Sequence, residues 1–100
     1  MAFEIEFTQG AADQVRAYRK FDQKVILDAL ESQLAHQPTT ETRNKKRLGE
    51  NERSDWELRV DRFRLFYDVL MQEERQIVRI KAVGHKTHNK LFIGGREVEL

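Results

Sequence analysis

The segment from Phe63 to Leu70 is almost entirely apolar on both of its alternating faces. A strand of that kind is buried on both sides, so it indicates the central strand of a sheet. The segments 56–60 and 77–83 on either side of it alternate apolar and polar residues, which is the pattern of half-buried strands. The short connections between these three segments, with a polar turn at residues 72–75, predict an antiparallel meander.

Two amphipathic helices and one further strand are expected before this meander. Residues 3–7 alternate apolar and acidic side chains, which indicates a half-buried strand. Thr8 can cap a first helix that runs to about Lys20, because its hydroxyl can accept from the free amides of the first turn. Asp22 can cap a second helix in the same way, with Phe21 before it as a hydrophobic staple. The tight turn between the helices predicts an antiparallel helical hairpin.

The remaining segments are a long loop and a terminal hairpin. Residues 39–54 are polar almost throughout, which predicts a loop that is either mobile or functional. Gly94 and Gly95 separate the short segments 91–93 and 97–100, and such a pair favours a tight β-hairpin. The predicted fold is therefore α+β, in the order strand, helix, helix and three antiparallel strands. The helical hairpin covers one face of the sheet, and a small β-hairpin ends the chain.

The composition limits the classes of protein that remain. One hundred residues are enough for a single domain, 1–100, and too few for a second core. No run of about 18 apolar residues could span a membrane, and the first residues do not resemble a signal peptide, which predicts a cytoplasmic protein. The absence of cysteine excludes disulfides, thiolate metal sites and thiol nucleophiles. We expect no metal and no other cofactor.

Charge is distributed unevenly along the chain. Residues 1–42 carry a net charge of −3, whereas residues 43–100 carry +4. This asymmetry suggests that a polyanion would bind the second half of the chain. The alternative is a solvated surface of mixed sign with no ligand.

The sheet face that the helices leave uncovered is where a functional site is expected. Alternation places Val78, Ile80 and Ala82 on the helix side, and it places on the open side Glu57, Arg59, Arg64, Phe66, Asp68, Arg79, Lys81 and Val83. Converging basic side chains suit a phosphate backbone, and Phe66 could stack on a base. The alternative is that cross-strand acid–base pairs on this face serve only solubility.

Two histidines follow the third strand of the meander. His85 and His88 lie beside basic residues, and histidine can donate or accept a proton near neutral pH. A metal site is poorly supported, because no third ligand has a matching spacing. A solvated surface side chain is the alternative for each of them.

Four short stretches, taken with the order of the elements, resemble the RelE/ParE toxin superfamily of bacterial type II toxin–antitoxin pairs. They are Lys46-Arg47-Leu48-Gly49, Trp56-Glu57-Leu58-Arg59-Val60, Phe63-Arg64-Leu65-Phe66-Tyr67 and Ala82-Val83-Gly84-His85-Lys86. The resemblance implies a metal-free endoribonuclease that cuts messenger RNA on the ribosome, by attack of the 2′-OH on the adjacent phosphate. It also implies a cognate antitoxin as partner. Other members of the superfamily inhibit DNA gyrase without catalysis, and a non-toxic relative that only pairs with its antitoxin is a third alternative.

The resemblance also suggests roles for individual residues. Arg64 matches the arginine of the family's central strand and is expected to stabilise the phosphate, with Arg59 and Lys86 at further basic positions. Lys45, Lys46 and Arg47 belong to the basic loop that approaches RNA in relatives.

Two positions depart from the family pattern. Glu57 stands where some relatives have a lysine, so it is either the general base or a partner that neutralises Arg59. Phe92 falls near a position where the RNA-cutting relatives have a tyrosine. Phenylalanine keeps the aromatic ring for stacking but lacks the hydroxyl. His85 or His88 is expected to supply the missing proton transfer.

Overall fold

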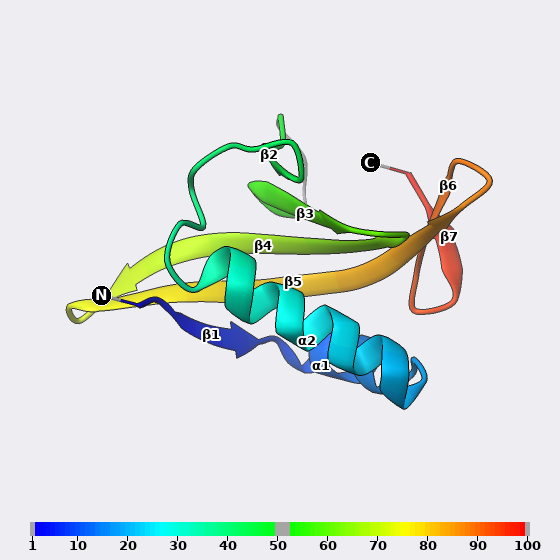
Figure 1. The fold of residues 1–100 in the computed structure, drawn as a ribbon, viewed down its shortest axis with the longest axis horizontal. Helices are drawn as coiled ribbons and strands as arrows, with labels where there is room; N and C mark the ends of the chain where they lie inside the picture. The colour runs from blue at the N-terminus through cyan, green and yellow to red at the C-terminus, as the bar shows by residue number, and fades with distance from the viewer. Residues whose placement is uncertain (1, 50–52, 100) are drawn as a thin grey trace.

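The chain folds into helices on a single sheet over residues 2–49 and 53–99, which are the residues that the computed structural model describes (Figure 1). The helices are α1 (Gln9–Arg16) and α2 (Lys20–Leu34). The strands are β1 (Glu4–Phe7), β2 (Lys45–Arg47), β3 (Trp56–Val60), β4 (Phe63–Gln72), β5 (Arg75–Thr87), β6 (Lys90–Ile93) and β7 (Arg96–Val98). The predicted α+β class is confirmed. Residues 50–52 of the predicted loop and Leu100 of the predicted last strand lie outside the described residues.

The strands form a sheet in the order β2-β3-β4-β5-β6-β7, with antiparallel pairing between neighbours. β1 pairs parallel to the part of β5 that runs from Ile77 to Ile80. The predicted meander is confirmed as β3, β4 and β5. Two expectations are wrong, because the loop 39–54 contains β2, and the third strand of the meander continues to Thr87.

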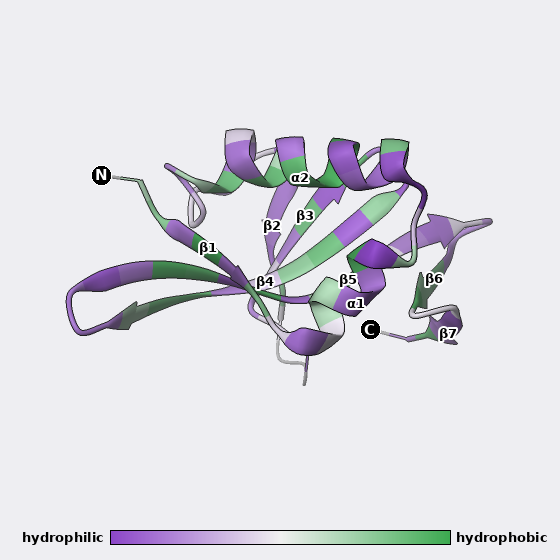
Figure 2. Ribbon diagram, turned by 90° about the horizontal axis from the view of Figure 1, so that it is seen from below, coloured by the Kyte–Doolittle hydropathy of each residue, from purple (hydrophilic) through white to green (hydrophobic). Residues whose placement is uncertain are grey.

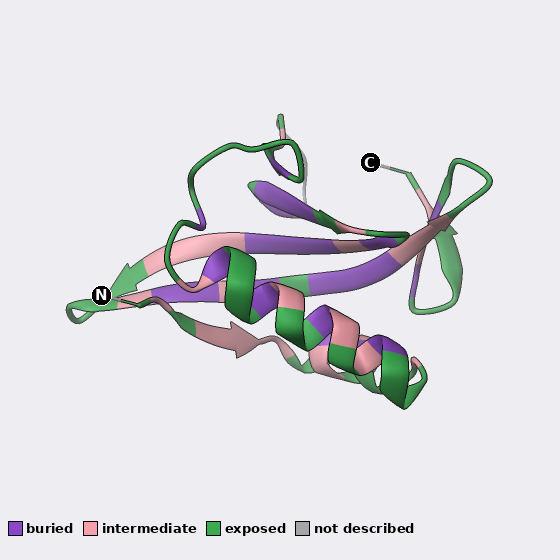
Figure 3. Cartoon of the chain, viewed as in Figure 1, coloured by how far each residue is buried: buried purple, intermediate pink, exposed green. Residues whose placement is uncertain are grey.

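Both helices lie on one face of the sheet, as predicted (Figure 1). The apolar side of α2 faces the sheet and its polar side faces solvent (Figure 2). The core between the layers takes residues from both helices, from β3, from the first half of β4 and from the middle of β5 (Figure 3). Its buried members are Ala11, Val15, Ile26, Leu30, Leu34, Trp56, Leu58, Phe63, Leu65, Tyr67, Val78, Ile80 and Val83. No helix within the described ranges is long and apolar enough to cross a membrane.

A β-bulge at Lys81 reverses the faces of the second half of β5. Phe66 pairs with Ala82 and the next residue of β4 pairs with Ile80, so Lys81 has no residue opposite it. Val83 therefore joins the core under the helices, whereas Ala82 lies on the other face with Phe66. The predicted faces of Ala82 and Val83 are wrong, because strict alternation does not allow for an inserted residue.

The C-terminal hairpin builds a second core on the face that the helices leave free. Gly94 and Gly95 have φ values of 61° and 79° and join β6 to β7, which confirms the predicted hairpin. β6 pairs with the end of β5, so the hairpin extends the sheet at that end (Figure 1). The second core contains Phe66, Ala82, Leu91 and Ile93, with Leu48 and Val98 packed against it. Part of the face that was expected to be open is therefore covered.

The first helix begins where the sequence predicts and ends earlier. Thr8 caps α1, because its hydroxyl oxygen accepts from the backbone amide of Ala11 at 3.1 Å. The helix stops at Arg16 rather than near Lys20. The second helix starts at Lys20 with Arg19 at its N-cap position. The turn between the helices, residues 17–19, thus lies earlier in the chain than the expected turn at Phe21 and Asp22.

Asp22 and Phe21 do not have the capping roles that the sequence suggests. Asp22 lies inside the first turn of α2, where its buried carboxylate is 3.4 Å from Nε of Arg19 and 3.3 Å from Nη2 of Arg62. Phe21 is 71% exposed and cannot act as a staple. Both predictions are wrong because α2 begins two residues before Asp22. The carboxylate instead connects α2 to the turn between β3 and β4.

Candidate functional site

Arg59 and Arg64 lie directly opposite each other on β3 and β4. Side chains in such positions have Cβ atoms about 4.5–5.5 Å apart, and like charges there destabilise a sheet. Glu57 shares their face and is the nearest compensating charge, with Oε1 at 3.2 Å from Nε of Arg59 and a side chain that is only 4% exposed. Two guanidinium groups thus share one buried carboxylate, which leaves the cluster positive.

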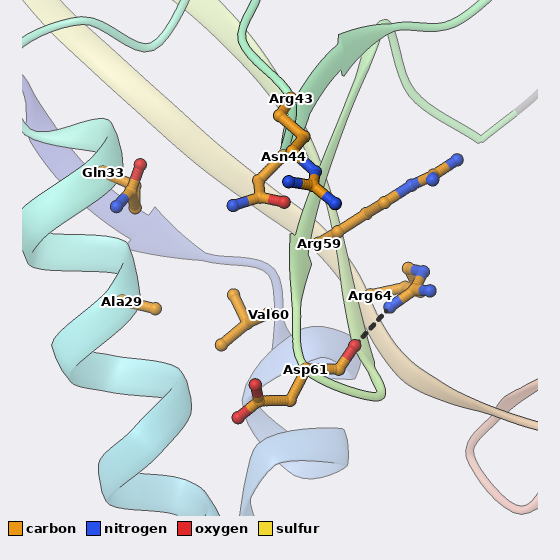
Figure 4. Close-up of a pocket in the computed structure, with 8 residues that line it drawn as sticks. All are labelled: Ala29, Gln33, Arg43, Asn44, Arg59, Val60, Asp61 and Arg64. Carbon is orange, nitrogen blue, oxygen red and sulfur yellow. Dashed lines mark hydrogen bonds between the residues drawn. The ribbon is translucent and has the colours of Figure 1, made fainter.

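The turn between β3 and β4 holds Arg64 in place. Its Nη1 donates to the carbonyl oxygens of Asp61 at 2.9 Å and Phe63 at 2.8 Å (Figure 4). Burial lowers the pKa of Arg64 and Arg59 lowers it further, whereas Glu57 raises it. An arginine remains charged in proteins despite such shifts, so the turn fixes a permanent cation. A donor fixed in advance stabilises a developing negative charge without further reorganisation.

A cavity of about 550 Å³ opens beside this pair, at the start of β2, where β3 extends beyond its pairing with β2. Eight residues line it: Ala29, Gln33, Arg43, Asn44, Arg59, Val60, Asp61 and Arg64. The guanidinium groups of Arg43, Arg59 and Arg64 lie on the side away from α2 (Figure 4). The pocket therefore brings three cations from the loop, β3 and β4 to one place. It suits an anionic ligand such as a phosphate group.

Lys45 is buried, which argues against the predicted contact with RNA. It is 3% exposed, and its Nζ donates to the carbonyl oxygens of Gln33 at 3.1 Å and Gln37 at 2.8 Å. Burial lowers the pKa of this ammonium group. Lys45 therefore satisfies carbonyl groups at the C-terminal end of α2 and ties the loop to the helix.

The neighbouring basic residues of β2 remain accessible. Lys46 and Arg47 are exposed, as a surface that approaches a nucleic acid requires. The Arg47 guanidinium carbon is 5.8 Å from the ring centroid of Trp56. The exposed part of the basic loop thus begins one residue after Lys45.

Phe66 is fully buried in the second core. The guanidinium carbon of Arg53 lies 5.9 Å from the centroid of its ring. The Phe66 ring is therefore not available to stack on a base, contrary to the sequence-based expectation. The reason is the C-terminal hairpin, whose residues Leu91 and Ile93 pack against it.

Arg79 and Lys81 lie on the same side of the sheet as Arg64 but farther along the strands. Arg79 is opposite Asp68, four residues from Arg64 on β4, which corresponds to roughly 13 Å. Arg79 forms an ion pair with Glu6 at 2.6 Å, and Lys81 forms one with Asp68 at 3.3 Å. Each of these two cations has an acidic partner, so they fit the alternative that acid–base pairs on this face serve only solubility.

Lys86 lies on the same face as Arg64, whereas His85 does not. Gly84 is the residue opposite Arg64, and Lys86 follows two positions along β5. His85 points to the helix side, where its Nδ1 is 2.7 Å from the hydroxyl of Tyr18 and its ring stacks on Phe92 with centroids 5.5 Å apart. Lys86 thus shares the face of the arginine pair but lines a separate hollow with Leu91 and Glu97, whereas His85 and Phe92 lie on the helix side.

His88 occupies the turn between β5 and β6 and is exposed, with a φ of 52°. Over residues 2–49 and 53–99, no group of three or more His, Asp or Glu side chains could hold a metal ion. The two predicted histidines thus lie in different environments, and only His88 is free of the helix-side contacts.

Sequence reasoning missed Arg43, Asn44 and Gln33 as site residues. Arg43 is one of several basic residues in the polar loop, so the sequence indicates its charge. The sequence does not indicate that Arg43 lines a pocket together with residues of α2. That position depends on two long-range contacts, namely the buried Lys45 ammonium and a bond of 2.8 Å from the Arg59 amide to the Asn44 carbonyl.

Fold and site together define a small α+β protein with a cationic pocket at one edge of its sheet. A chain in the crystal structure of the toxin–antitoxin complex RelBE2 from Mycobacterium tuberculosis has the same fold, with a TM-score of 0.70. The match covers 86% of this chain and 100% of that chain at 20% sequence identity. At this level of identity the likeness concerns the fold alone.

The sequence match identifies the family. The family described as "ParE toxin of type II toxin-antitoxin system, parDE" matches residues 5–89. The chain therefore belongs to the ParE toxin family of type II toxin–antitoxin systems, which confirms the predicted membership of the RelE/ParE superfamily. No curated protein matches the chain.

Proposed function

We propose that this protein is the toxin of a type II pair and an endoribonuclease that cleaves messenger RNA in the cytoplasm. The observation that carries the proposal is the like-charge pair of Arg59 and Arg64 on opposite positions of β3 and β4. Such a pair costs stability and has no solubility advantage over an acid–base pair. A phosphodiester bound between the two groups would supply the missing negative charge.

In the proposed reaction the substrate's own 2′-oxygen forms a bond to the adjacent phosphorus, and the bond from phosphorus to the 5′-oxygen breaks. The dianionic phosphorane is stabilised by Arg64 and Arg59, with Lys86 as a third cation on the same face. The products are a 2′,3′-cyclic phosphate and a free 5′-OH. No metal or other cofactor takes part.

Proton transfer is the second part of the proposed chemistry. The 2′-OH must lose a proton and the leaving 5′-oxygen must gain one. Glu57 is nearly fully buried beside Arg59, which supports the neutralising role for it over the role of general base. Its task is then to position Arg59. His85 is engaged by Tyr18, and His88 lies four residues, roughly 13 Å, beyond the residue opposite Arg64, so the groups that transfer these protons are left unassigned.

The test is cleavage of messenger RNA by the purified protein with translating ribosomes, followed by mapping of the RNA ends. We expect cyclic or 3′-phosphate ends and 5′-OH ends, and we expect Arg64→Ala to lower the rate by on the order of a hundredfold. Arg75→Ala is the matched control, because Arg75 pairs with Glu4 at the far end of the sheet. Equal cleavage by the wild type and Arg64→Ala would remove Arg64 from the site.

The partner proposed for this toxin is a cognate antitoxin. The structurally similar RelBE2 chain was crystallised in a toxin–antitoxin complex. Complementary charge favours an acidic antitoxin segment, since residues 43–100 carry +4. The neighbouring gene tests this directly. We expect a short reading frame with a DNA-binding head and a disordered acidic tail, and its product should co-purify with the toxin.

Inhibition of DNA gyrase is the second candidate function. The observation that favours it is the family itself, because the matching description is that of ParE toxins. A supercoiling assay with purified gyrase separates the two candidates. Inhibition of supercoiling without RNA cleavage would replace the ribonuclease proposal. Normal growth of bacteria after induced expression would instead identify a non-toxic relative that only pairs with its antitoxin.

A further inference from the structure

The pocket beside the arginine pair has a second half that faces α2. There the lining consists of the amide side chains of Gln33 and Asn44, the carboxylate of Asp61 and the apolar side chain of Val60. Asp61 turns its carboxylate toward α2 and away from the arginines (Figure 4). Within the described part of the chain, these three polar side chains have no hydrogen-bond or ion-pair partner. The half-pocket thus offers unused donors and acceptors above an apolar floor.

The backbone under these side chains is fixed by contacts between three elements. The buried ammonium of Lys45 donates to the carbonyl of Gln33 at 3.1 Å, which ties α2 to β2. The amide of Arg59 donates to the carbonyl of Asn44 at 2.8 Å, which ties the loop to β3. Asp61 follows β3 directly and has a φ of 53°, in the left-handed region that aspartate and asparagine tolerate best among side-chain-bearing residues. The backbone positions of the three residues are therefore fixed, and their exposed side chains are accessible to a ligand.

We propose that this half-pocket is a nucleobase subsite that selects guanine beside the phosphate held by Arg59 and Arg64. The inference rests on the proposed function, because it takes a single-stranded RNA as the ligand. The cavity of about 550 Å³ lies within the range of roughly 300–1,000 Å³ that is usual for small-ligand sites. Single-stranded RNA is read through the exposed edges of its bases.

The carboxylate of Asp61 is the group that decides between bases. A carboxylate only accepts hydrogen bonds, and its two oxygens suit two adjacent donors. Guanine presents such a pair on its Watson–Crick edge, at N1–H and the N2 amino group. Adenine, cytosine and uracil each place an acceptor next to their donor there, which a carboxylate repels. The amides of Gln33 and Asn44 can donate to the remaining acceptors of guanine.

The test is binding of short, non-cleavable oligonucleotides measured by fluorescence anisotropy. The probes are labelled 2′-O-methyl uridine hexamers that carry one central guanosine, adenosine, cytidine or uridine. We expect the guanosine hexamer to bind the wild type about tenfold more tightly than the others, as one well-made base contact allows. Asp61→Asn should abolish this preference, since an amide places a donor where guanine also donates.

Asp28→Asn is the matched control for the change in net charge. Asp28 is exposed on α2, pairs with Lys24 and does not line the pocket. Both variants lose one negative charge, so both should bind all hexamers slightly better, but only Asp28→Asn should keep the guanosine preference. Asparagine tolerates the left-handed backbone of position 61, so Asp61→Asn should fold.

The outcomes separate this inference from the proposed function. Binding of all four hexamers with equal affinity, weakened by Arg64→Ala, would overturn the guanine subsite and leave the ribonuclease proposal standing. A guanosine preference that survives in Asp61→Asn would also overturn the subsite. No binding to any hexamer, together with no cleavage of messenger RNA, would overturn both.

Discussion

The hydroxyl of Tyr18 lies 2.7 Å from Nδ1 of His85 and joins the turn between the helices to β5. Burial raises the pKa of Tyr18, so its hydroxyl stays protonated at neutral pH and can donate. Burial lowers the pKa of His85, and the positive charge of Arg62 lowers it further. The imidazole is therefore neutral at pH 7, and its Nδ1 shares a hydrogen bond with the tyrosine hydroxyl.

This pair makes the protein less stable in mild acid. The pKa of His85 in the folded state is below its unfolded value of about 6.5, so the unfolded chain binds more protons as the pH falls past that value. The contribution of His85 is complete above pH about 6.5 and is lost toward the lower folded pKa. We expect the urea concentration at the unfolding midpoint to decrease when the pH is lowered from 7.5 to 5.5. The decrease should be smaller in His85→Asn. The same fall in both proteins would contradict this assignment.

Lys45 is expected to matter for stability rather than for RNA binding. Replacement by methionine keeps the apolar stem and leaves the partly buried carbonyls of Gln33 and Gln37 without this donor. Each unsatisfied group costs about 1–3 kcal/mol, so the free energy of unfolding should fall by at least that much. The exposed neighbour Lys46 supplies the control, and Lys46→Met should be within about 0.5 kcal/mol of the wild type. Urea denaturation of both variants measures these changes. An equal loss of unfolding free energy in Lys45→Met and Lys46→Met would refute the structural role of Lys45.

Much of the fold follows from patterns that act over a few residues. Apolar alternation correctly predicts β3, β4 and the first half of β5, and the Gly94-Gly95 pair predicts the final hairpin. The bulge at Lys81 could not be predicted in this way, because the inserted residue is defined only by the pairing of two strands. The start of α2 could not be predicted either. Asp22, which resembles an N-cap in the sequence, instead lies in the first turn of α2 and contacts Arg62, forty residues away.

In the candidate site, too, local patterns predict some features, and contacts between distant segments determine the others. Arg59 and Arg64 share a face by alternation alone, and the structure agrees. The exposure of Phe66 and of Lys45 depends on what covers them, which is the hairpin for one and the end of α2 for the other. The place of Arg43 in the pocket depends on how the loop docks against α2. Local sequence patterns contain no information on such contacts.

Gly84 is required by the close approach of β6 to β5. A Cβ at this position would overlap the carbonyl oxygen of Phe92 and come within 2.7 Å of Cγ1 of Ile93. Gly84→Ala should therefore push the hairpin away from the second core and cost about 1–3 kcal/mol, as overpacking does. Gly10→Ala is the control, because position 10 lies in α1 with nothing within 4 Å of an added Cβ.

The two alanine variants are expected to change stability in opposite directions. Alanine favours a helix over glycine by about 1 kcal/mol, so Gly10→Ala should raise the free energy of unfolding. Thermal denaturation measures both changes. A Gly84→Ala protein as stable as the wild type would mean that the hairpin is not packed closely on β5.

The backbone of the turn between β4 and β5 is strained, and substitutions can relieve this strain. Glu73 and Glu74 are its two central residues and have φ values of 47° and 67°, where an ordinary side chain is disfavoured. A two-residue turn of this shape prefers Asn-Gly. Replacing Glu73 by asparagine and Glu74 by glycine should therefore stabilise the protein by about 1 kcal/mol, which corresponds to a rise in Tm of roughly 4–8 °C. The control Glu73→Gln with Glu74→Gln removes the same two charges and keeps the strain. If it raises the Tm as much as the Asn-Gly variant does, repulsion between the carboxylates rather than backbone strain limits the stability of this turn.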